Sequence, residues 1–112
     1  MTTKPDTQMS VRLRPQHPEM TALLRKFPFM QWKLAYWPSC LTSDPIVANA
    51  YCGASSGEKR VIEFLLHVWS PNTDWTELGY QNFNLGNALG TWGYPSKASE
   101  AAAEWVRCPF FP

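Results

Sequence analysis

Glu63 and His67 have the spacing that most directly suggests chemistry in this sequence. They stand four positions apart in a segment with helical periodicity, so both side chains fall on one helix face. A carboxylate placed there can orient an imidazole for general base catalysis or for metal binding. A metal site needs two or three further ligands, and none stands nearby in the sequence. We therefore expect an exposed surface pair.

The cysteines offer a second route to catalysis. Cys40, Cys52 or Cys108 can act as a nucleophile if His67 or His17 serves as its base. No nucleophile motif surrounds any of them, and no C-x-x-C spacing indicates zinc or a disulfide framework. The common phosphate-binding, hydrolase and metalloprotease motifs are absent as well. We expect free, partly buried thiols, and we expect no metal and no cofactor.

Basic residues gather in the first third of the chain, at Arg12, Arg14, Arg25, Lys26 and Lys33. With Trp32 and Trp37 between them, they can form a face that holds phosphates and stacks bases. Residues 1–36 carry a net charge of +4 and residues 37–112 carry −3, which leaves the whole chain at +1. A nucleic-acid-binding domain is usually far more basic. Nucleic-acid binding therefore stays an alternative.

Aromatic residues make up 14% of the chain, with six Trp, six Phe and four Tyr. Trp69, Trp92 and Trp105 fall on apolar helical stripes, where an aromatic side chain fills the core. Trp75 lies in a short polar segment, and the final pair, Phe110 and Phe111, has no periodic context. These last three residues are the candidates for anchors on a protein-binding surface.

The length and composition indicate one globular domain. The chain has 112 residues, of which 45% are hydrophobic and 17% are charged. We expect residues 1–8 to be a polar tail and residues 9–112 to be the domain. The longest apolar run is too short to cross a membrane, and residues 1–17 have no secretory signal. The cytoplasm, where thiols stay reduced, is the simplest compartment.

The amino-terminal part predicts a β-α-β element. Residues 10–14 and 30–37 alternate like strands, and residues 18–27 carry a helical stripe that begins at Pro18 and stops before Pro28. One face of the second strand is apolar and consists of Met30, Trp32, Leu34 and Tyr36. Two strands alone leave a free edge, so we expect self-association through this face, as a homodimer.

The rest of the chain predicts a helical cluster. We expect a helix over 45–52 and a second helix that follows a capping box of Ser55 and Glu58 and is ended by Pro71. We also expect a short helical turn over 72–78 ended by Gly79, a helix over 83–92 capped by Asn82, and a last helix capped by Ser96. Residues 61–68 also fit a strand, which would supply a third strand. Glycines at 86 and 90 predict a close approach to the small residues Ala98, Ala101 and Ala102. The fold class is thus α+β, dominated by helices.

The second half of the chain resembles a known group of proteins. The run from Phe64 (FLLHVWSP), through Phe83 and Trp92, to the ending W-x-x-x-P-F-F-P is similar to small uncharacterised proteins of bacterial accessory genomes, of the kind that mobile elements carry. The resemblance implies an origin of that kind. It implies no reaction and no functional residues.

Together these observations favour a non-enzymatic protein that binds a protein partner through aromatic surface patches, such as an inhibitor or adaptor of a phage or mobile element. The first alternative is a nucleic-acid-binding protein that uses the basic first third. The second is a small enzyme that uses His67 with Glu63 or a cysteine.

Overall fold

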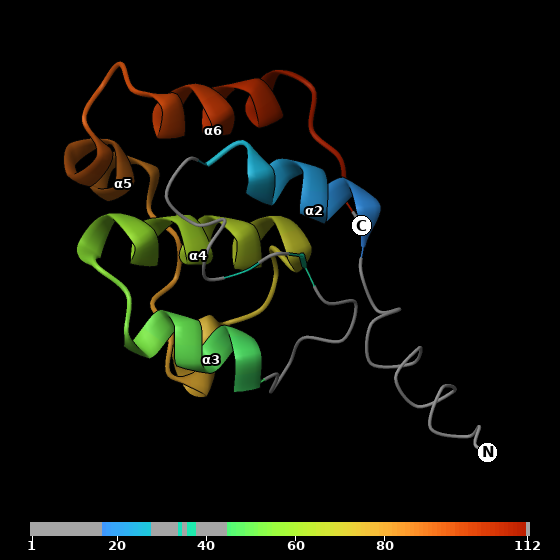
Figure 1. Cartoon of the computed structure of the whole chain (residues 1–112), viewed down its shortest axis with the longest axis vertical. Coiled ribbons are helices and arrows are strands. Elements are labelled where there is room, and N and C mark those ends of the chain that lie inside the picture. The colour runs from blue at the N-terminus through green and yellow to red at the C-terminus, as the bar shows by residue number, and fades with distance from the viewer. Residues whose placement is uncertain (1–16, 28–33, 35, 38–44, 112) are drawn as a thin grey trace.

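The computed structural model describes residues 17–27, 34, 36–37 and 45–111 (Figure 1). In these residues it has five α-helices and one 3-10 turn: α2 (Pro18–Arg25), α3 (Pro45–Cys52), α4 (Ser56–Trp69), η1 (Trp75–Leu78), α5 (Leu85–Trp92) and α6 (Lys97–Arg107). Helix α4 lies in the middle, between α3 on one side and α2 on the other, and α5 packs against it. Helix α6 lies beyond α2 and contacts α5.

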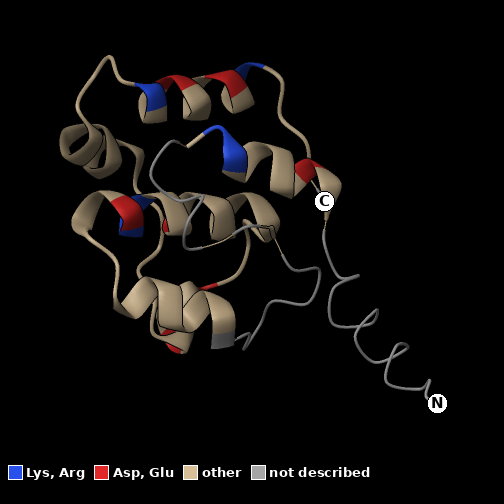
Figure 2. Ribbon diagram, viewed as in Figure 1, with Lys and Arg blue, Asp and Glu red and all other residues tan. Residues whose placement is uncertain are grey.

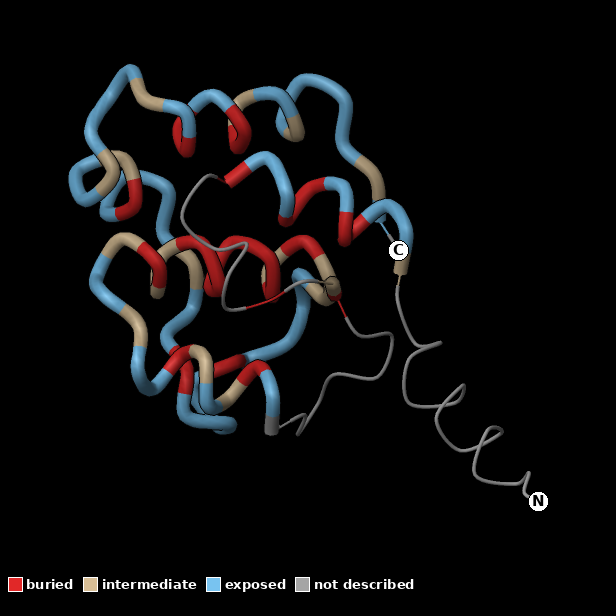
Figure 3. The backbone as a smooth tube through the Cα atoms, viewed as in Figure 1, coloured by how far each residue is buried: buried red, intermediate tan, exposed pale blue. Residues whose placement is uncertain are grey.

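Helix α4 is buried almost all the way round (Figure 3). Its Ser55 hydroxyl accepts from the Glu58 backbone N–H at 3.3 Å, and the Glu58 carboxylate accepts from the Ser55 N–H at 2.9 Å, which confirms the predicted capping box. The buried apolar side chains are Val61, Ile62, Phe64, Leu65, Leu66 and Val68. Each contributes about 1.5–3 kcal/mol when fully buried. This helix is therefore the centre of the core.

The predicted β-α-β element is wrong, because no described residue lies in a strand. The predicted strand at 10–14 falls outside the described residues, as does the predicted tail at 1–8, and only positions 34, 36 and 37 of the second strand are described. The backbone of Trp37 bonds to the start of α2 instead: its N–H donates to the Thr21 hydroxyl at 3.1 Å, and its carbonyl accepts from the His17 N–H at 2.9 Å. The backbone of Trp37 therefore hydrogen-bonds to a helix and its cap, and not to a neighbouring strand.

The alternative strand at 61–68 is wrong too, and the helix predicted there is confirmed as part of α4. Its sequence fits both patterns for a physical reason. A helix that is covered on nearly every side carries apolar residues at consecutive positions, so alternate residues are apolar as well. Helical spacing predicts one apolar stripe of Val61, Phe64, Leu65, Val68 and Trp69. Ile62 and Leu66 lie off this stripe and are still fully buried.

Of the two other predicted helix caps, one is confirmed and one is wrong. Ser96 caps α6, with its hydroxyl accepting from the Ser99 N–H at 3.1 Å. Helix α5 is capped by Asn84, whose side-chain oxygen accepts from the Asn87 N–H at 2.9 Å, so the predicted cap at Asn82 is wrong. The side-chain oxygen of Asn82 accepts from the Trp75 N–H instead, at 2.9 Å, and so holds the 3-10 turn.

The predicted seam of small residues between α5 and α6 is not formed by the glycines. The three alanines predicted for the seam, Ala98, Ala101 and Ala102, are buried, as a seam would require. A Cβ atom built at Gly90 would meet nothing within 4 Å, and one at Gly86 would meet only the Asn84 side chain, at 3.5 Å. Gly90 therefore faces open space, and neither glycine closely approaches the alanines of α6.

Replacing Gly90 by Ala should stabilise the protein. The site is a helix interior with free room, so the change should raise the free energy of unfolding by about 0.5–1 kcal/mol. Urea denaturation followed by circular dichroism measures this. Gly79→Ala is the matched control: Gly79 has φ of 92°, so there Ala should lower the stability by about 1–2 kcal/mol. A loss of stability in Gly90→Ala would mean that α5 packs differently.

Candidate functional site

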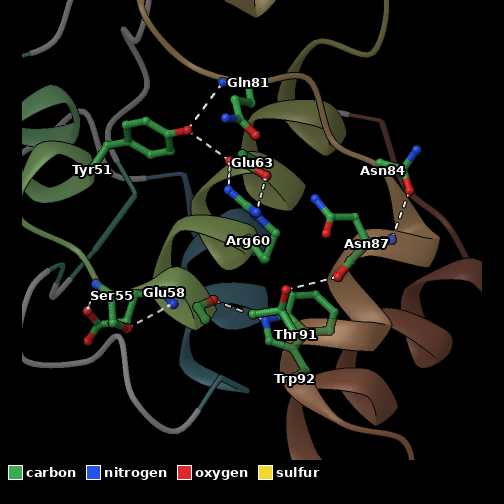
Figure 4. A network of polar contacts seen from close by, with 11 residues as sticks. Tyr51, Ser55, Glu58, Arg60, Glu63, Gln81, Asn84, Asn87, Thr91 and Trp92 are labelled. Carbon is green, nitrogen blue, oxygen red and sulfur yellow. Dashed lines mark hydrogen bonds and ion pairs between the residues drawn. The ribbon is translucent and has the colours of Figure 1, made fainter.

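Glu63 forms a buried network in place of the expected surface pair with His67 (Figure 4). Glu63 is only 2% exposed to solvent. The Arg60 guanidinium contacts both carboxylate oxygens, with Nε 2.7 Å from Oε1 and Nη2 donating to Oε2 at 2.7 Å. The Tyr51 hydroxyl donates to Oε2 at 2.8 Å. A buried carboxylate needs such partners to offset its lost hydration, so Glu63 serves the fold.

Tyr51 ties three segments together through its hydroxyl group. That group lies on α3, donates to Glu63 on α4, and accepts from the Gln81 backbone N–H at 3.3 Å (Figure 4). Burial raises the pKa of the Tyr51 phenol, and the hydrogen bond to the Glu63 carboxylate raises the pKa further. The neutral phenol is therefore the form that the folded protein favours.

His67 is half-buried among aromatic rings, with Phe83 at 5.9 Å and Trp105 at 6.5 Å between ring centroids. It borders a depression of about 400 Å³ that also includes Asp74. The Asp74 carboxylate accepts hydrogen bonds from Thr76 and Asn82, and these lower its pKa. Within the described residues no hydrogen bond joins His67 to Glu63.

The described residues contain no hydrogen-bonded pair of a cysteine and a histidine, which the cysteine alternative requires. Cys52 and Cys108 are free and exposed, and Cys40 falls outside the described residues. The Nδ1 atom of His17 accepts from the Met20 N–H at 3.4 Å, and its ring lies edge-on to Trp69. No hydrogen bond links a thiol to a histidine in the part of the chain that the structure describes, nor does that part contain three clustered metal-ligating side chains.

Of the five basic candidates for nucleic-acid contact, two are described, Arg25 and Lys26; Arg12, Arg14 and Lys33 fall outside. The Lys26 ammonium lies 2.7 Å from the Glu104 carboxylate and lowers the pKa of that carboxyl. Basic and acidic residues both occur along α6, as the colours of the ribbon in Figure 2 show. The described surface here is thus mixed in charge, which does not suit a polyanion.

The apolar face predicted for self-association is described at two of its four positions. Leu34 is buried and Tyr36 is half-buried. Met30 and Trp32 fall outside the described residues. Leu34 therefore points into the core of the chain itself, where it is not free to form a dimer interface.

The three aromatic anchor candidates lie in different surroundings. Trp75 is buried, with its ring edge-on to Tyr80 at 6.1 Å between centroids. Phe110 is half-buried, whereas Phe111 is 66% exposed. Of the three candidates, Phe111 is therefore largely exposed, Phe110 is exposed in part, and Trp75 is not available at the surface.

Trp105 fixes the position of this end. Its indole ring packs on Phe64 of α4 at 5.7 Å, and its indole N–H donates to the Phe110 carbonyl at 3.2 Å. The Phe111 ring lies edge-on to the same indole, at 5.7 Å between centroids. In Figure 1 the segment after α6 runs down to the first turn of α2. The exposed Phe111 ring therefore packs against an indole that is itself in contact with the core.

A groove of about 250 Å³ lies beside this aromatic end, between α2 and the end of α6. Its lining residues are Glu19, Ala22, Leu23, Lys26, Glu104, Trp105, Cys108 and Phe110. We call the groove together with Phe111 the C-terminal aromatic surface. The contribution of α2 was not predictable from sequence spacing, because it depends on the contact of two helices that are far apart in the chain.

Comparison with known protein families, with curated proteins and with solved structures gave no match to this chain. No helix among the described residues is both long and apolar enough to span a bilayer.

Removing the Tyr51 hydroxyl should weaken the fold. Tyr51→Phe leaves Glu63 with one donor fewer and the Gln81 N–H without this acceptor, so we expect a loss of about 1–3 kcal/mol in the free energy of unfolding at pH 7. Urea denaturation measures the loss. An unchanged stability would show that water replaces the hydroxyl at no cost.

The size of this loss should depend on pH. The pKa of the Tyr51 phenol is raised in the folded state, so its contribution is complete below the unfolded value of about 10 and is lost as the pH rises through the folded value. The difference in stability between the wild type and Tyr51→Phe should therefore narrow above pH 10. The other tyrosines are common to both proteins and cancel. A difference that stays constant to pH 11 or above would contradict the raised pKa.

Proposed function

We propose that this protein acts by binding another protein through the C-terminal aromatic surface, without catalysis. The observation that carries the proposal is Phe111, a large apolar side chain that is 66% exposed and yet held in place. Exposure of this kind adds little to folding, and aromatic side chains are the usual anchors of protein interfaces.

The preorganised position of Phe111 supports this proposal. A mobile side chain loses rotamer freedom when it binds, at a cost of about 0.5–1.5 kcal/mol. The bond from Trp105 to the Phe110 carbonyl holds the backbone beside Phe111, and the edge-on contact with the same indole orients its ring. Much of the ordering that a partner would otherwise impose is therefore already present.

The catalytic alternative has less support, because its named residues have structural partners. Glu63 is paired with Arg60 and Tyr51, and the His17 ring accepts a bond from the backbone of α2. Following the resemblance of the second half of the chain, we propose an inhibitor or adaptor role in bacteria, with an origin in a phage or mobile element. We place it in the cytoplasm, where the free thiols of Cys52 and Cys108 would stay reduced.

Phe111→Ala tests the proposal, with Tyr94→Ala as its matched control. Tyr94 is 75% exposed and lies in the turn between α5 and α6, outside the C-terminal aromatic surface. The wild type and each variant are immobilised on a resin and incubated with a bacterial lysate, and the retained proteins are identified by mass spectrometry. We expect a protein that the wild type and Tyr94→Ala retain and Phe111→Ala loses. Once that partner is purified, Phe111→Ala should bind it more weakly than the wild type does, by about 2 kcal/mol, close to 30-fold.

Both variants should unfold at the temperature of the wild type, since both side chains are largely exposed. Equal retention by all three proteins would contradict the proposal. Nucleic acid in the eluate, seen as a high ratio of absorbance at 260 to 280 nm, would favour the nucleic-acid alternative.

A further inference from the structure

The groove of the C-terminal aromatic surface has the dimensions of a slot for protein side chains. One wall is a single face of α2, where Glu19, Leu23 and Lys26 stand at helical spacing. Positions 19 and 26 are seven residues apart, which corresponds to about 10 Å along the helix axis. The volume of about 250 Å³ is below the range of about 300–1,000 Å³ that is usual for small-molecule pockets.

The two ends of the groove differ in charge. At one end the Lys26 ammonium and the Glu104 carboxylate lie 2.7 Å apart and neutralise each other. At the other end the Glu19 side chain is exposed and forms no ion pair with any described residue. The lining therefore combines an apolar floor with one net negative charge, located at the Glu19 end.

We infer that the partner segment that fills this groove presents a bulky apolar side chain beside a lysine or arginine. The apolar side chain packs between Leu23, Trp105 and Phe110, and the cation pairs with Glu19. This inference rests on the proposed function and names the chemistry of the partner. Because the ion pair lies at an exposed edge, its effect is modest, and it decreases as salt screens the charges.

Two synthetic peptides can test the preference directly. Both are about 15 residues long, with Leu and Phe on one helix face, and they differ only in carrying Lys or Glu on either side of the Phe. Binding to the full chain is measured by fluorescence anisotropy of the labelled peptide. We expect the Lys peptide to bind at least about fivefold more tightly than the Glu peptide in dilute salt, and the ratio to approach one at about 0.5 M salt.

Two variants locate the charge that is responsible. Glu19→Gln should remove the preference for the Lys peptide and leave the binding of the Glu peptide unchanged or stronger. Glu100→Gln is the matched control: this exposed carboxylate lies on α6 outside the groove, so the preference should persist. Phe111→Ala should weaken both peptides alike.

Three results would overturn the inference. One is equal or tighter binding of the Glu peptide, and another is no binding of either peptide. The third is a dimer of the wild type by light scattering that Phe111→Ala converts to a monomer, because a second copy would then occupy the groove. The proposed function is judged separately, by whether Phe111→Ala loses a protein that the wild type captures from the lysate.

Discussion

The need to cover α4 determines how the rest of the described chain is arranged. A helix whose residues are apolar on nearly every side cannot lie at a surface, so neighbouring elements must supply its surroundings. Helices α2 and α3 cover opposite sides of it, and α5 packs against it as well. The indole N–H of Trp92 on α5 also donates to the Gly57 carbonyl in the first turn of α4, at 3.0 Å (Figure 4). The core is thus one helix surrounded by shorter ones.

A polar network is built into this apolar centre. Glu63 brings a carboxylate into the core, and Arg60 and Tyr51 supply the donors that it needs. Because Tyr51 also accepts from Gln81, the same network fixes α3 and the segment after η1 relative to α4. Arg60 and Glu63 lie on the same helix, so the bonds that join different segments are those of the Tyr51 hydroxyl.

Much of the helical part could be predicted from local signals, and the long-range part could not. Caps such as Ser55 and Ser96 act within one turn, so their residues alone indicate where a helix begins. The alternating apolar run at 30–37 indicated a strand, but alternation does not say what the backbone will bond to, and Trp37 bonds to α2. Trp75 shows a similar limit: its polar, exposed neighbours favour a surface position, while Trp75 itself is buried in the core.

For the candidate site, the terminal phenylalanines were predictable and their setting was not. Nothing in the local sequence shows that Trp105 would contact Phe64 in the core and also hold Phe110 and Phe111. This single indole connects the buried centre of the protein to its exposed aromatic end. The core thereby positions an apolar ring at the surface, and this is the physical basis of the partner binding that we propose.

Site-specific photo-crosslinking tests this conclusion most directly. Benzoylphenylalanine, which keeps an aromatic ring, is placed at position 111 in one protein and at position 94 in another, and each is irradiated in a bacterial lysate. We expect one discrete protein adduct from position 111 that position 94 does not form, with the contacted peptide identified by mass spectrometry. The same diffuse adducts from both positions, or none from position 111, would contradict a binding surface at this end of the chain.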